Sequence, residues 1–114
     1  MRIDIAERCL ELSIKVIKSA ESLNYSVSSK IVIHQLIRST TSIGANITEA
    51  QAGSSKKDFT NYYCIALKSS KETIYWLRLL KAISGLDLNI YNELVDEVTQ
   101  ISKIIGASII KLKN

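Results

Sequence analysis

Apolar side chains recur at three- and four-residue spacing along most of the 114-residue chain, which is the pattern of amphipathic helices. Four such stretches cover residues 4–23, 29–52, 55–84 and 89–112, and short polar segments separate them. The chain has no proline, which suits long helices because an interior proline costs about 3 kcal/mol. Short connections favour neighbouring helices that run in opposite directions. The sequence therefore predicts an all-α protein, an antiparallel up-down-up-down four-helix bundle in a single domain over residues 1–114.

Polar residues mark the expected helix ends. Asp4 is followed three residues later by Glu7, which is the spacing of a capping box at the start of the first helix. Ser55 and Asp58 repeat that spacing before the third helix. Gly53 follows the second stretch, where a glycine commonly ends a helix. These signals agree with the boundaries drawn from the apolar pattern.

A line of small polar side chains runs beside the apolar stripe of the second stretch. Its members are Gln35, Ser39, Ser42, Asn46 and Glu49. Small hydroxyl and amide side chains let a neighbouring backbone approach while they hydrogen bond across the contact. Gly44 in the same stretch costs about 1 kcal/mol relative to alanine, and a closely packed neighbour would explain that cost. The line is either a tight helix–helix seam or a recognition strip, and the sequence leaves both interpretations open.

The third stretch carries more apolar surface than one bundle core requires. A second cluster lies roughly 100° away from its core face and consists of Ile65, Trp76, Leu79 and Ile83. In an isolated bundle this side turns toward water, so a tryptophan flanked by aliphatic side chains indicates a subunit interface. The alternative is that the bundle twists enough to cover the cluster.

The net charge of +4 comes from the third stretch, because residues 54–86 hold six basic and two acidic side chains and the rest of the chain nets to zero. The candidate residues for nucleic-acid binding are Lys56, Lys57, Lys68, Lys71, Tyr75 and Arg78. Lys56 and Lys57 fall at a helix N-terminus, where free N–H groups, two serines and two ammonium groups together suit a phosphate. An outward arc of the same helix carries Lys57, Lys68, Lys71 and Arg78 with Tyr75 among them, and this arc suits an RNA backbone and one stacked base. A solvated face without a ligand is the alternative.

Residues that carry catalysis or bind metals form no recognisable motif. The sequence shows no Glu-x-x-His pair, no glycine-rich phosphate loop and no recognisable nucleophile–base pair. Cys9 and Cys64 lack metal-ligand spacing and are expected to be small buried side chains. His34 lies outside the apolar arc and is expected at the surface. We therefore expect no enzyme activity, no cofactor, no metal and no small-molecule substrate.

The sequence also gives no sign of a membrane segment. The longest apolar run, residues 104–110, has seven residues, whereas a membrane helix requires roughly 20. Arg2 is followed by Asp4 and Glu7, which does not resemble a signal peptide. We expect a cytoplasmic protein without a membrane partner.

One segment of the second stretch resembles a known family. Its motif reads Arg38-Ser39-x-x-Ser42-Ile43-x-Ala45-Asn46-Ile47-x-Glu49-Ala50, which is similar to the signature of the 23S rRNA intervening-sequence protein family, the bacterial four helix bundle proteins. Ala50 departs slightly from the family pattern, in which the residue after the glutamate is often glycine. The later segment Tyr75-Trp76-Leu77-Arg78-Leu79-Leu80 resembles the family's third helix. The chain is also similar to the accessory protein of diversity-generating retroelements.

The resemblance covers nearly the whole chain. It implies an up-down four-helix bundle, assembly into a homopentamer, association with RNA or a nucleoprotein partner, and no known catalysis. Together with the basic third stretch and its second apolar cluster, it favours a ring-like oligomer that binds RNA or a nucleic-acid-processing protein. The alternative is a structural or adaptor bundle that binds an acidic protein without touching nucleic acid.

Overall fold

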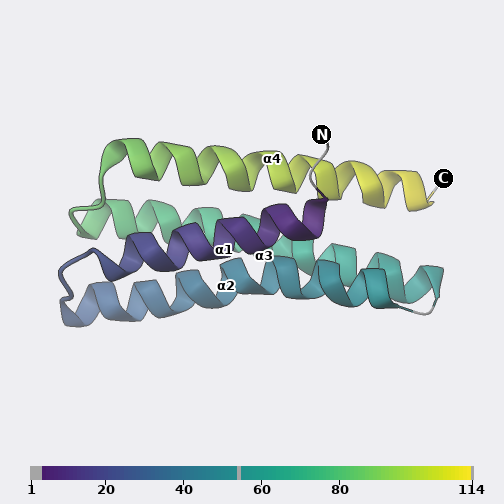
Figure 1. Ribbon diagram of the computed structural model, residues 1–114, viewed down its shortest axis with the longest axis horizontal. Coiled ribbons are helices and arrows are strands. Elements are labelled where there is room, and N and C mark those ends of the chain that lie inside the picture. The colour runs from purple at the N-terminus through teal and green to yellow at the C-terminus, as the bar shows by residue number, and fades with distance from the viewer. Residues whose placement is uncertain (1–3, 54, 114) are drawn as a thin grey trace.

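The computed structural model describes residues 4–53 and 55–113, which form four α-helices (Figure 1). They are α1 (Ile5–Glu21), α2 (Val27–Ala52), α3 (Lys56–Ile83) and α4 (Leu88–Lys113). No strand occurs among the described residues, so the prediction of an all-α protein is confirmed. None of the helices in the described part of the chain is long and apolar enough to cross a membrane.

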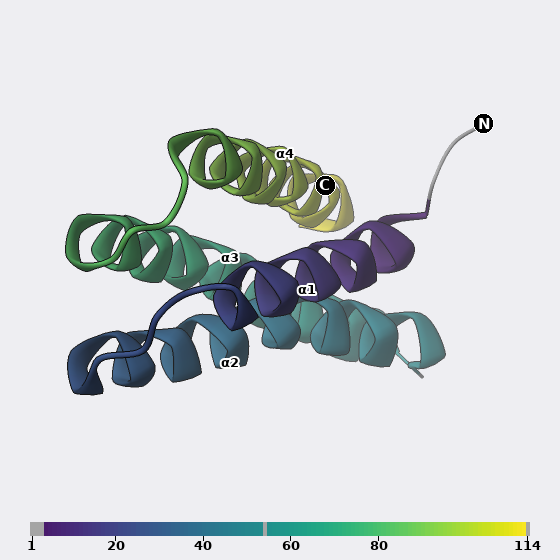
Figure 2. The same ribbon diagram turned by 60° about the vertical axis from the view of Figure 1, so that its left-hand side comes forward.

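The helices lie side by side in a molecule that measures 45 × 29 × 20 Å. Successive helices are joined at alternating ends, and α1 and α3 both lie between α2 at the bottom and α4 at the top (Figures 1 and 2). The α2–α3 pair is the most extensively packed, and among the pairs of helices in contact α1 and α4 are the least packed. As a result, α2 borders two outward-facing sides of the molecule, one shared with α1 and the other with α3.

The core lies between the four helices and is built from the apolar stripes that the sequence shows. The largest side chains that are fully buried include Leu12, Leu36, Ile43, Ile47, Leu77, Leu80, Ile101 and Ile105. Burying each such side chain contributes about 1.5–3 kcal/mol. Several small hydroxyl side chains of α2 and α3 are buried with them, and no buried side-chain polar atom of the described residues lacks a hydrogen-bond partner.

Serine side chains cap α2 and α3. The Ser26 hydroxyl accepts from the Ser29 N–H at 3.1 Å, and the Ser29 hydroxyl accepts from the Ser26 N–H at 2.8 Å. This reciprocal capping begins α2 at Val27, two residues before the start at about residue 29 that the apolar pattern predicts. The pair was missed because the usual partner at its second position is Glu or Gln. At α3 the prediction is confirmed, since the Ser55 hydroxyl accepts from the Asp58 N–H at 3.0 Å.

The predicted capping box at α1 is wrong. The Asp4 side chain makes no capping hydrogen bond to the first turn. Its Oδ1 atom instead accepts from Gln51 Nε2 at 3.3 Å, so the start of α1 is tied to the last turn of α2. The local pattern could not foresee this contact, because Gln51 comes from a different helix.

Candidate functional site

The line of small polar residues on α2 faces α3. The Ser42 and Ser69 hydroxyl oxygens lie 2.9 Å apart, and Thr73 Oγ1 lies 3.0 Å from Ser39 Oγ. Asn46 Nδ2 donates to the Ser42 backbone oxygen at 2.8 Å, beside the same contact. Ser39, Ser69 and Thr73 are buried. These contacts support the seam interpretation, because small side chains bring the two backbones close and satisfy their hydroxyl groups across the contact.

A polar cluster at the outer edge of this seam joins α2 to α3. Arg38 Nε donates to Gln35 Oε1 at 2.8 Å, and Arg38 Nη2 pairs with Glu72 Oε2. The same Glu72 oxygen accepts from Trp76 Nε1 at 2.7 Å. Glu49, the last residue of the polar line, is exposed. No sequence pattern indicates the Arg38–Glu72 pair, because the two residues come from different helices and no helical period relates them.

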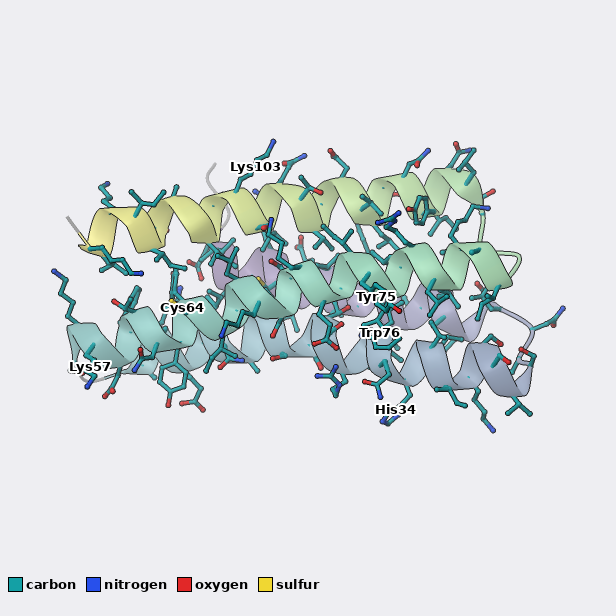
Figure 3. All side chains as sticks on the ribbon, turned by 180° about the vertical axis from the view of Figure 1, so that it is seen from behind. His34, Lys57, Cys64, Tyr75, Trp76 and Lys103 are labelled. Atoms are coloured by element: carbon teal, nitrogen blue, oxygen red, sulfur yellow. The ribbon has the colours of Figure 1, made fainter. Side chains whose placement is uncertain are left out.

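The second apolar cluster of α3, here called the tryptophan face, consists of Ile65, Trp76, Leu79 and Ile83. The exposed fractions of Ile65 and Ile83 are 46% and 43%, while Trp76 and Leu79 are half-buried at the edge of the core. Figure 3 shows Trp76 at the border between α3 and α2. The described chain therefore leaves Ile65 and Ile83 open to water and covers part of Trp76 and Leu79.

The candidate nucleic-acid-binding residues, here called the basic strip, are Lys56, Lys57, Lys68, Lys71, Tyr75 and Arg78, and every one is exposed. The ion pairs of the described residues are Arg8–Glu97, Lys15–Glu93 and Arg38–Glu72, so no cation of the basic strip takes part in one. Of the two serines expected beside Lys56 and Lys57, Ser55 caps α3 and Ser54 lies outside the described residues.

The basic strip is a long ridge. From Lys57 to Arg78 it extends about 32 Å at the rise of an α-helix. Figure 3 shows Lys57 near one end of α3 and Tyr75 far from it along the same helix. Tyr75 is 57% exposed, and its ring meets the Trp76 ring edge-on, with centroids 4.9 Å apart. A ridge of this shape suits contacts at several successive phosphates better than it suits one small anion.

The remaining candidate residues do not gather into a reactive centre. Cys9 is fully buried, and burial raises the pKa of its thiol to about 12, so this thiol stays protonated at neutral pH. Cys64 is half-buried and His34 is exposed. Within residues 4–53 and 55–113, no three His, Cys, Asp or Glu side chains converge in a way that could hold a metal ion.

Four packed helices, a tight polar seam and a basic outer helix define a small all-α protein of the helical-bundle type. The chain belongs to the 23S rRNA-intervening sequence protein family, which matches residues 1–107. It is also similar to the crystal structure of a protein with unknown function from the S23 ribosomal protein family of Bacteroides thetaiotaomicron VPI-5482. That likeness has a TM-score of 0.81 and 32% sequence identity, and it covers 93% of this chain and 98% of the other. No curated protein matches the chain.

Proposed function

We propose that this chain is a non-enzymatic, antiparallel up-down-up-down bundle whose copies assemble into a ring-like homo-oligomer in the cytoplasm, a pentamer by family resemblance. In this proposal the oligomer binds RNA or a nucleoprotein partner through the basic strip of α3. The observation that carries the proposal is that the cations of the basic strip are exposed and form no ion pair with a carboxylate of the described residues.

A row of cations without paired carboxylates is a surface that binds the phosphate backbone of a nucleic acid. Each lysine or arginine that contacts a phosphate releases a condensed counterion, and this release drives binding. A net charge of +4 is modest for one chain, but five copies would carry about +20 and would repeat the strip around the ring. Tyr75 lies among the cations with an open ring, which suits a stacked base.

The test is a salt titration of binding to a panel of structured and single-stranded RNAs. We expect affinity to fall steeply with salt, and we expect the Lys56→Ala/Lys57→Ala variant to reduce the log–log slope by about 1.5, since each phosphate contact contributes about 0.7–0.9. A matched control, Lys103→Ala/Lys113→Ala, removes the same charge from exposed positions of α4 and should change the slope little. Figure 3 shows Lys103 on α4, well away from Lys57.

The same titration separates the proposal from the adaptor function. The half-open tryptophan face beside the basic strip also suits an acidic protein surface, where apolar contact and cations act together. Binding that is undetectable for every RNA, or that does not respond to salt, would reject the RNA proposal and favour the adaptor.

A further inference from the structure

A pocket opens between the first turns of α3 and the last turns of α4. It measures about 220 Å³ and is lined by Phe59, Tyr63, Ser108, Lys111 and Leu112. Drug-sized ligands occupy pockets of roughly 300–1,000 Å³, so this one suits a single planar ring. Figure 3 shows the end of α3 that carries Lys57 beside the C-terminal part of α4, where the pocket lies.

One wall of the pocket is aromatic. The rings of Phe59 and Tyr63 are stacked, with centroids 4.5 Å apart and an angle of 21° between their planes. Phe59 is only partly buried, and Leu112 borders the same space from α4. Proteins that bind unpaired RNA stack splayed-out bases on aromatic surfaces of this kind. The wall therefore suits the face of one nucleobase.

A hydroxyl group without a protein partner borders the pocket. Tyr63 is 6% exposed, yet its phenol makes no hydrogen bond to any described residue. No buried side-chain polar atom of the described residues lacks a partner, so the Tyr63 hydroxyl must reach solvent, and the pocket is the open space that Tyr63 lines. Burial raises the pKa of this phenol, so the hydroxyl stays protonated and donates to an acceptor on a bound ring.

The rim of the pocket is basic. Lys111 lines it from α4, and Lys56 lies one helical turn before Phe59 on the same face of α3. Both lysines are exposed and form no ion pair with a described residue. Residues 98–113 of α4 contain no carboxylate, so the α4 side of the pocket carries positive charge only. This rim suits the phosphate of a nucleotide whose base enters the pocket.

We propose that this pocket receives the base of one unpaired nucleotide of the RNA, with the base against Phe59, an acceptor on its edge at the Tyr63 hydroxyl and its phosphate at Lys111. This inference rests on the proposed RNA binding and adds to it a site for a single nucleotide, at the end of the basic strip where Lys56 lies. The cations of the strip hold a phosphate backbone of any sequence, whereas the pocket requires a base that is free of a duplex. The RNA that binds best is then one with an unpaired nucleotide next to the segment on the strip.

Two RNA duplexes of one sequence test the pocket. One duplex is blunt, and the other carries a single unpaired 2-aminopurine nucleotide at one end. We expect the duplex with the overhang to bind about tenfold more tightly, because stacking one base on an aromatic side chain contributes on that scale. The 2-aminopurine fluorescence should fall on binding, because the base stacks against Phe59. Free nucleoside 5′-monophosphates, which lack the contacts of the strip, should displace the overhang duplex only at far higher concentration.

Three variants locate the unpaired nucleotide. Tyr63→Phe removes only a hydroxyl that has no partner among the described residues, so it should leave the melting temperature unchanged and reduce the preference for the overhang about fivefold. Phe59→Leu keeps an apolar side chain and should remove most of the preference. Lys111→Ala should weaken binding of the overhang duplex, whereas Lys103→Ala, at an exposed lysine of the same helix outside the pocket, should not.

The outcomes separate the pocket from the basic strip. A wild-type protein that binds neither duplex would reject the proposed RNA binding and this inference with it. Equal, salt-sensitive affinity for the two duplexes would leave the basic strip standing and overturn the pocket. A preference that survives each of the three variants would also overturn it, because the nucleotide would then bind elsewhere. Displacement by a free nucleoside monophosphate at the concentration of the overhang duplex would assign the pocket to a free nucleotide and overturn its role in RNA binding.

Discussion

Gly44 sets how closely α1 approaches α2. A Cβ atom built at this position would lie 3.0 Å from the Cβ of Cys9 and 3.7 Å from the Cys9 carbonyl carbon. Carbon atoms pack best at about 3.5–4.0 Å, so the first distance is too short. No glycine of the described residues has a positive φ. The close approach of α1, and not the backbone conformation, therefore explains why position 44 is a glycine. Gly106 of α4 has nothing within 4 Å of its would-be Cβ and provides a comparison.

Alanine at these two positions should therefore have opposite effects on the free energy of unfolding. Gly44→Ala gains about 1 kcal/mol of helix propensity but overpacks the contact with Cys9, whose Cβ is fixed to the backbone of α1, at a cost of about 1–3 kcal/mol. We expect a net loss of about 1 kcal/mol. Gly106→Ala should gain up to about 1 kcal/mol. Urea unfolding with a common m-value measures both, and a Gly44→Ala protein as stable as the Gly106→Ala protein would contradict the close approach.

Two polar pairs join α1 to α4, the least packed neighbouring pair of helices. Arg8 donates to Glu97 through Nη2 at 2.6 Å and through Nε at 3.1 Å, and its Nη2 also reaches Gln100 Oε1 at 3.1 Å. Lys15 and Glu93 form a second pair at 3.2 Å. The exposed fractions are 22% and 27% in the first pair and 56% and 62% in the second, so water screens the second pair more strongly.

Double-mutant cycles should rank the two pairs in that order. We expect a coupling free energy of about 1 kcal/mol for Arg8–Glu97, because a two-pronged guanidinium–carboxylate contact is shielded and geometrically fixed. We expect no more than about 0.5 kcal/mol for Lys15–Glu93. Alanine variants, singly and together, give both values from urea unfolding. Equal coupling free energies would contradict the expectation that shielding from water makes the Arg8–Glu97 pair the stronger of the two.

The apolar repeat of the sequence specifies each helix and its core face, but it does not specify how far one helix is shifted along its neighbour. The stripe Leu94, Val98, Ile101 and Ile105 repeats every three or four residues, so the core face of α4 follows from the sequence alone. The Arg38–Glu72 pair depends on how far α2 slides along α3, and no local pattern encodes that distance. The exposure of the basic strip follows from the helical period of α3 and could be predicted, whereas the hydrogen bond between Asp4 and Gln51, which joins two helices, could not.

At the scale of the whole molecule, α3 carries two surfaces that meet at Tyr75 and Trp76. The Trp76 indole N–H donates to Glu72 Oε2 at 2.7 Å, and this bond holds the ring against the polar cluster at the edge of α2 and α3. Glu72 in turn is paired with Arg38, so the only glutamate of α3 is neutralised within the chain and does not cancel the basic strip. An assembly through the tryptophan face would therefore keep the cations of neighbouring copies on one continuous surface.

A charge placed at Trp76 tests that assembly. Trp76→Glu puts a carboxylate in the middle of the tryptophan face and beside Glu72, and burying it against another copy would be costly. We expect a folded 12.7 kDa monomer in light scattering, with a melting temperature that no longer rises with protein concentration. Ile110→Glu is the control, because Ile110 is 64% exposed on α4, the helix opposite α2, and should keep the wild-type mass. If Trp76→Glu also keeps that mass, the tryptophan face is not a subunit interface, and the exposure of Ile65 and Ile83 must serve a different partner.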